Sequence, residues 1–402
     1  MKLVKILFFV VICLSLTGCY DKTELDNLAY VIGIGLDIGE AQNGEDDDND
    51  GENLNITYQI AIPVKIAGEN NSSGKETYTT YTVSASSLFM GNSIVNAMAS
   101  KEINLSHINI ILYSEEIAKK GLSGHINGLL SDTDIRPKTP VAICRGKASD
   151  FFNQITPVLE TNPARYYSLI LSSFNYTDES IGSELISFYS NAQSIDREAS
   201  TVIGEISSKE LNDSNSDENK DKAVFKGLAV FKAGTMIGEI PPKITDAHLL
   251  LTNALKRGNV TVKDPEDENS IATATIRQYT PTKINVDVKD KVPKVDITLF
   301  INAHFEASNS TTDYLNPENK LKLKKAIQEK ITSNIYEYLN EIKKLDSDIV
   351  GIGKYAKVKC LTWEDYEDLH WQEIFKNSEF NVKVEVDLDI SRIVFHKLPN
   401  QS

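Results

Sequence analysis

Clustered carboxylates are the first residues in this sequence whose spacing suggests chemistry. Asp46, Asp48, Asp50 and Gly51 match positions 1, 3, 5 and 6 of a calcium-binding EF-hand loop. Position 12 of such a loop is a bidentate glutamate, whereas this chain has Thr57 there, within a strand pattern. We therefore expect a solvated acidic loop, with loose attraction of cations as the alternative.

Two glycine patterns suggest phosphate binding but lack essential residues. Gly351-Ile352-Gly353-Lys354 resembles the end of a phosphate loop, yet Asp348 and Tyr355 replace the first glycine and the hydroxyl residue. Gly33 and Gly35 lie inside a strand pattern, where close backbone packing explains them better than dinucleotide binding. Neither pattern predicts a nucleotide site.

The remaining reactive residues do not form a catalytic constellation. No two of the six histidines have metal-ligand spacing, and no G-x-S-x-G serine is present. Glu364, Asp365, Glu367 and Asp368 include spacings open to a glycosidase carboxylate pair, but such a run is more typical of an exposed helix face. We expect no catalytic residue, no metal site and no cofactor.

Cys19 is the one residue with a strong chemical signature. A basic start is followed by an apolar segment at residues 6–16, which is too short to span a bilayer. The segment ends in Leu16-Thr17-Gly18-Cys19, the pattern of a bacterial lipobox. We expect residues 1–18 to be a signal peptide and the Cys19 thiol to carry a diacylglyceryl group that holds the chain at a membrane surface.

Composition excludes several classes of protein. The 57 acidic residues outnumber the 42 Lys and Arg, giving a net charge of −15, which argues against nucleic-acid binding. Four cysteines in 402 residues exclude a disulfide scaffold. We expect Cys144 and Cys360 to be buried free thiols, and a bridge between them is the alternative.

The first 200 residues alternate between strand and helix patterns, which is typical of an α/β domain. Ser84 or Ser86 is predicted to cap a helix that carries Leu88, Val95 and Met98 on its inner faces. The predicted strands cover residues 28–38, 54–64, 77–83, 107–113 and 139–145, and helices follow at 124–130, 147–155, 163–174 and 180–189.

The rest of the chain divides into a middle and a C-terminal part. Residues 225–232 and 235–240 predict a hairpin that turns at Ala233-Gly234, and a helix follows at 246–256. In the C-terminal part, strands of period two predict an antiparallel sheet. Apolar residues from Leu323 to Leu345 recur every three or four positions and predict a long helix on that sheet.

Taken together, these patterns predict a mixed α/β and α+β fold with three domains. The expected units are an N-terminal α/β domain at 19–200, a small middle domain at 201–272 and a C-terminal α+β domain at 273–402. Trp363 and Trp371 fall in the last unit. They either lock its final helix onto the sheet or provide an anchor for a protein partner.

Several runs in this chain resemble one family. They are G-C-Y-D-K-T-E-L at 18–25, V-I-G-I-G-L-D at 31–37, F-K-G-L-A-V-F-K at 225–232, D-I-V-G-I-G at 348–353 and H-W-Q-E-I-F at 370–375. The sequence resembles the Ger(x)C family, the lipoprotein C subunits of bacterial spore nutrient-germinant receptors. It departs from that pattern in the long acidic insert at 45–52.

The resemblance implies a function that the residues alone do not predict. It implies a complex with two integral-membrane receptor subunits, of A and B type, at the non-cytoplasmic face of the inner spore membrane. It also implies spore germination in response to small nutrients. A solute-binding lipoprotein of a transporter is the alternative, and it would need a ligand cleft between two similar lobes.

Overall fold

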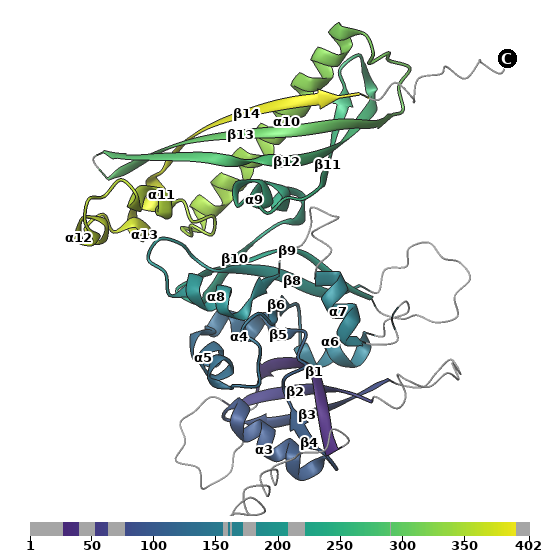
Figure 1. The fold of residues 1–402 in the computed structure, drawn as a ribbon, viewed down its shortest axis with the longest axis vertical. Helices are drawn as coiled ribbons and strands as arrows, with labels where there is room; N and C mark the ends of the chain where they lie inside the picture. Colours follow the sequence, from purple (N-terminus) through teal and green to yellow (C-terminus); the bar gives the residue numbers. More distant parts are fainter. Residues whose placement is uncertain are drawn as a thin grey trace, which may run out of the picture.

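A computed structural model describes residues 27–39, 53–62, 77–155, 160, 163–171, 182–207, 222–289 and 291–390. Two separate sheets, one of ten strands and one of four, lie along the long axis of the molecule (Figure 1). The predicted mixed α/β and α+β class is confirmed. Cys19 and the acidic loop at 45–52 lie outside the described residues. No described helix is both long enough and apolar enough to cross a bilayer.

The N-terminal sheet has the order β10-β9-β8-β6-β5-β1-β2-β3, with β4 beside β1 and β7 beside β6. Neighbours among β1, β5, β6 and β8 are parallel, and antiparallel strands extend the sheet on both sides. The strands are β1 (Leu28–Ile38), β2 (Leu54–Ala61), β3 (Tyr78–Ala85), β4 (Glu102–Asn104), β5 (Ile111–Ser114), β6 (Pro140–Cys144), β7 (Ser183–Glu184), β8 (Ser200–Ser207), β9 (Lys222–Lys232) and β10 (Thr235–Ile240).

Helices cover both faces of this sheet, and the sheet separates two buried clusters. One face is covered by α3 (Leu88–Met98), α4 (Glu115–Lys120), α5 (Ser123–Ser131) and α8 (Leu185–Ala192). The other is covered by α6 (Ala148–Gln154) and α7 (Pro163–Leu171). The cap of α3 is Ser87, one residue beyond the predicted Ser86, and its Oγ accepts from Met90 N at 3.3 Å.

Residues 201–272 contribute strands to both sheets. The predicted hairpin is confirmed as β9 and β10, with Ala233 and Gly234 at positive φ in the turn, and both strands belong to the N-terminal sheet. After η3 (Pro242–Ile244) and α9 (Thr245–Leu251), the chain enters β11 (Gly258–Asp264) of the C-terminal sheet. The range predicted as a middle domain therefore forms the connection between the sheets.

The C-terminal sheet has the order β11-β12-β13-β14, with β12 (Asp267–Lys289), β13 (Val292–Ser308) and β14 (Glu379–Asp389). The long helix α10 (Pro317–Lys344) is confirmed, and its predicted apolar stripe is buried from Leu323 to Ile342. One detail of the prediction was wrong: β14 pairs with β13 in parallel. The excursion through α10 returns the chain to the end of the sheet where β13 began, so β14 runs in the same direction.

Short helices connect α10 to the last strand. They are α11 (Gly353–Lys357), α12 (Trp363–Glu367), α13 (Trp371–Ile374) and η4 (Phe375–Asn377). In Figure 1 these elements gather at one end of the C-terminal sheet, next to the N-terminal sheet. They bring together two of the sequence runs that resemble the family, 348–353 and 370–375.

Candidate functional site

The candidate site is the contact between the two sheets, centred on the buried carboxylate of Asp348. Asp348 Oδ1 accepts from Gly351 N at 2.8 Å and from Ile352 N at 3.0 Å. Its Oδ2 accepts from Gly353 N at 2.8 Å and from Trp371 Nε1 at 3.0 Å. Four donors surround one carboxylate, and this arrangement fixes the loop at 351–353 against α13.

Burial and hydrogen bonding act in opposite directions on this carboxylate. Removal from water raises the pKa of Asp348, whereas its backbone and indole donors lower that pKa. These donors also explain why the Gly351–Lys354 pattern does not form a phosphate site. The backbone N–H groups that a phosphate would need are already bound to Asp348.

The turn that contains Asp348 also binds the N-terminal sheet. Ser347 Oγ donates to Phe231 O at 2.8 Å, and Glu198 N donates to Asp348 O at 3.0 Å. Lys232 Nζ forms an ion pair with Asp346 at 2.5 Å. We call this set of contacts, made by residues 346–353 and Trp371 with residues 194–198 and 231–233, the junction.

Glycines at the junction permit a close approach of the two parts. A Cβ on Gly353 would lie 2.6 Å from the carbonyl oxygen of Asp196 and 2.6 Å from Trp371 Nε1. Gly351 has φ +81°, and a Cβ there would lie 3.1 Å from the Arg197 side chain. Both glycines of the run at 348–353 are thus explained by packing and backbone conformation.

An apolar core continues across the junction. Leu228, Val230 and Ile240 belong to β9 and β10 of the N-terminal sheet, yet they are buried in the same cluster as α9, α10 and the C-terminal strands. The two sheets are therefore joined by shared side-chain packing as well as by hydrogen bonds.

Glu198 is a titratable group within the junction. Its Oε2 accepts from Ala233 N at 3.0 Å, and Oε1 has no hydrogen-bond partner among the described residues. Burial raises the pKa of Glu198 from 4.5 to about 7, although the bond from Ala233 and the nearby Lys232 lower it. This carboxyl therefore changes charge near neutral pH.

The two tryptophans have different environments. Trp371 is 2% exposed and belongs to the junction, whereas Trp363 is 49% exposed. Trp363 Nε1 donates to Glu367 at 2.6 Å, and Lys357 Nζ lies 4.3 Å from the centroid of the Trp363 ring. Of the two tryptophans, only Trp363 is exposed to solvent.

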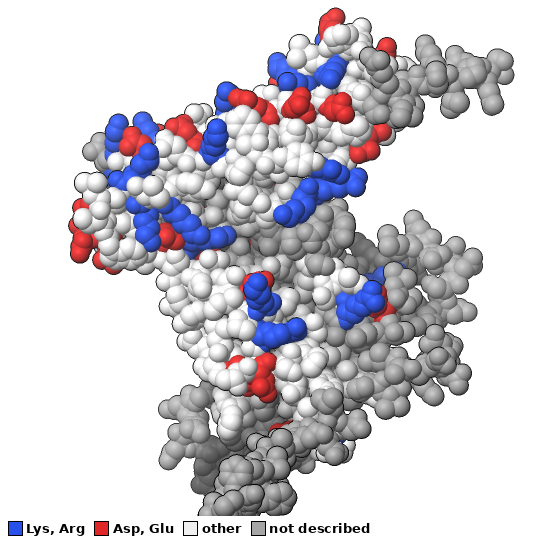
Figure 2. Space-filling model, viewed as in Figure 1, with Lys and Arg blue, Asp and Glu red and all other residues white. Residues whose placement is uncertain are grey.

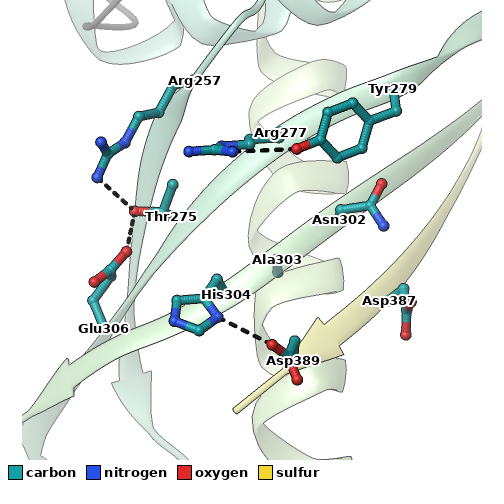
Figure 3. Close-up of a pocket in the computed structure, with 10 residues that line it drawn as sticks. All are labelled: Arg257, Thr275, Arg277, Tyr279, Asn302, Ala303, His304, Glu306, Asp387 and Asp389. Atoms are coloured by element: carbon teal, nitrogen blue, oxygen red, sulfur yellow. Dashed lines mark hydrogen bonds and ion pairs between the residues drawn. The ribbon is translucent and has the colours of Figure 1, made fainter. Parts of the chain in front are cut away.

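A shallow pocket lies on the face of the C-terminal sheet opposite α10 (Figure 3). His304 Nδ1 lies 3.3 Å from Asp389, and Thr275 donates to Glu306 at 2.6 Å. Figure 2 shows basic and acidic side chains close together over this half of the molecule. Mixed charges of this kind are typical of a solvated sheet face. Within the described ranges, no three His, Cys, Asp or Glu residues are grouped to bind a metal.

The structure also explains the glycines and the aspartate of the run at 31–37. Gly33 and Gly35 allow α6 to approach β1, since a Cβ on Gly33 would lie 2.7 Å from the Phe152 ring. Asp37, which ends the run at 31–37, accepts from Ala148 N at 2.7 Å and Ser149 N at 3.0 Å at the start of α6.

The predicted thiols and acids are also located. Cys144 is buried as expected, but Cys360 is only half-buried, and both are free. The four acids at 364, 365, 367 and 368 are exposed, as predicted for a solvated helix.

Sequence reasoning missed the N-terminal side of the junction. Asp196, Arg197 and Glu198 follow no motif, and their partners lie about 150 positions further along the chain. The one signal that pointed to this place was the pair of glycines in the run at 348–353.

Comparison with known proteins places both halves of the chain in one family. Residues 21–207 match the spore germination protein N-terminal domain, and residues 226–392 match the family described as spore germination B3/GerAC like, C-terminal. Spore germination protein KC of Bacillus subtilis (strain 168) is 22% identical over 92% of this chain and 91% of its own. Spore germination protein B3 of the same organism is 19% identical over 94% and 95%.

A solved structure shares the fold. The crystal structure of the GerBC protein superposes with a TM-score of 0.51 at 15% identity, covering 92% of this chain and 99% of that one. Among the described residues, the runs at 31–37, 225–232, 348–353 and 370–375 each have a structural role in this fold. The two family models together show that this chain belongs to the Ger(x)C family of spore germination proteins.

Proposed function

We propose that this chain is a lipid-anchored, non-enzymatic subunit of a nutrient germinant receptor. It acts through contacts with two integral-membrane subunits, of A and B type, at the non-cytoplasmic face of the inner spore membrane. Family membership and the lipobox at Cys19 support this proposal.

The observation that carries the proposal is the structural role of the residues that resemble the family. Asp348, Gly351, Gly353 and Trp371 join two sheets, and Asp37 fixes a helix. Residues in these roles make the protein rigid, as we expect of a subunit that transmits or resists force between its partners. Because the junction combines a shared apolar core with buried hydrogen bonds, the two sheets move together. A partner that binds one sheet therefore also affects the position of the other.

An exposed apolar surface near the junction is the proposed partner contact. Val358 and Leu361 are 81% and 97% exposed and precede the half-exposed Trp363 in the chain. Aromatic side chains in such surroundings often dominate the energy of an interface. Of the two tryptophans proposed from the sequence, Trp363 makes this contact and Trp371 positions the loop that presents it.

The solute-binding alternative requires two similar lobes around a ligand. Here the sheets have ten and four strands and different connections. Calorimetry with candidate nutrients on the chain from residue 20 separates the two functions, because tight binding would favour the solute-binding protein.

Membrane fractionation of spores tests the proposal. We expect Cys19→Ala to remove the chain from the inner-membrane fraction and to slow germination. Cys360→Ala alters a half-buried free thiol and should leave membrane retention and the germination rate unchanged. Trp363→Ala should stay in the membrane but recover less of two polytopic partners on co-purification. Normal membrane retention and nutrient response in Cys19→Ala would contradict the proposal.

A further inference from the structure

The exposed part of α3 carries three large apolar side chains, beside the polar Ser93 and Asn96, that the proposed function does not use. Phe89, Met90 and Met98 are 77%, 47% and 60% exposed. The eleven residues of α3 include no charged side chain. A solvated helix normally carries charged residues on its outer face, so this composition indicates contact with something other than water.

The orientation of α3 is fixed, so these side chains cannot turn inward. Leu88 and Val95 are buried on the inner face, and a Cβ on Gly91 would lie 2.6 Å from the Tyr58 hydroxyl oxygen. Sequence patterns had placed Met98 on an inner face, and the structure contradicts this. Phe89 projects from the side of the helix opposite Gly91, and Met98 is exposed as the last residue of α3.

This surface lies beside the point where the described chain begins. Leu28 pairs with Glu102 of β4, and the next residue of β4, Ile103, donates its N–H to Asn96 of α3 at 2.8 Å. Leu28 lies nine positions after Cys19, a reach of at most roughly 32 Å. Figure 1 shows α3 and β4 at the end of the molecule farthest from the C-terminal sheet.

From this placement we infer that Phe89, Met90 and Met98 insert into the membrane interface beside the lipid anchor, as a second point of attachment. The inference rests on the acylation of Cys19 in the proposed function, which keeps α3 close to the bilayer. A net charge of −15 is repelled by anionic lipids, so the attachment is apolar and is not weakened by added salt.

The purpose of such a second contact is orientation. A lipid chain joined through so short a segment limits the distance to the membrane but leaves the body free to rotate. A helix face in the interface adds a second fixed point, and the sheet behind α3 then stands at a defined angle to the bilayer.

Quenching by brominated lipids tests the inference. The lipidated chain is reconstituted into vesicles of phosphatidylcholine and phosphatidylglycerol with brominated acyl chains, and Phe89→Trp is compared with Leu361→Trp. The natural Trp363 and Trp371 lie at the junction end and give the baseline in both variants. We expect quenching of the emission added at position 89 and none of that added at position 361.

Vesicle binding of the unlipidated chain from residue 20, which keeps every described element, gives a second measurement. Replacing Phe89, Met90 and Met98 by Ser should reduce partitioning by about tenfold for each side chain that is fully immersed. The matched control replaces three exposed apolar residues of the C-terminal part that lie outside the proposed partner contact, Ile271, Leu315 and Leu321, and should bind like the unmodified chain.

The outcomes separate this inference from the proposed function. Unquenched emission at position 89 in chains that float with the vesicles would overturn the insertion of α3 but leave the lipid anchor in place. Such a result would assign the surface to a protein partner. Failure of the lipidated chain to float would overturn both proposals, and equal losses in the two triple variants would also contradict a role for α3.

Discussion

Asp348→Asn is the most direct test of the junction. The substitution keeps the size of the side chain but replaces Oδ2, the acceptor for Gly353 N and Trp371 Nε1, by an NH₂ group. Two buried donors then lack an acceptor, and each such loss costs about 1–3 kcal/mol. The neutral amide also avoids the cost of burying a charge, so we expect a net decrease in the free energy of unfolding of about 2–4 kcal/mol.

Urea unfolding of the chain from residue 20, followed by tryptophan fluorescence and circular dichroism, measures this change. Asp368→Asn provides the control, because its carboxylate is exposed and its replacement should alter the free energy by less than about 0.5 kcal/mol. A double-mutant cycle with Trp371→Phe should give a coupling of about 1 kcal/mol or more, since that variant removes one of the same donors. A loss below about 1 kcal/mol for Asp348→Asn, together with additive effects, would refute the account of the junction.

Two further predictions concern the same contacts. Because the folded-state pKa of Glu198 is raised from 4.5 to about 7, its contribution to stability is present below pH 4.5 and is lost as pH rises through 7. Relative to Glu198→Gln, unmodified protein should therefore lose up to about 3 kcal/mol of unfolding free energy between pH 4.5 and 8, and parallel pH profiles would contradict this. Gly353→Ala should lose about 2–3 kcal/mol in thermal unfolding, since the new Cβ would overlap Asp196 and Trp371. Gly128→Ala on α5 meets no atom within 4 Å and should be neutral or slightly stabilising, so equal losses in the two variants would exclude a packing role for Gly353.

Local patterns predicted the elements of this protein well. The strand at Leu28–Ile38, the hairpin at Ala233-Gly234 and the long helix after Pro317 each follow from nearby residues. Periodicity records which face of an element is apolar, but it carries no information on the direction of a neighbouring strand. The parallel pairing of β14 with β13 was therefore missed.

The site was predicted only in part because its contacts join distant residues. In the sequence, Asp348 stands where a phosphate loop would have its first glycine. Only the fold shows that four hydrogen-bond donors surround its carboxylate. Glu198 carried no signal of its own. Met98 was assigned to the core because it is apolar, but it is the last residue of α3 and is 60% exposed.

The outer edge of the C-terminal sheet has a consequence for solubility. β14 is the last strand in the described order, and its exposed positions carry Lys383, Glu385, Asp387 and Asp389. Adding a strand from another molecule would bring these charges against a second backbone and dehydrate them. The edge thus resists the strand-to-strand aggregation to which long, flat sheets are prone.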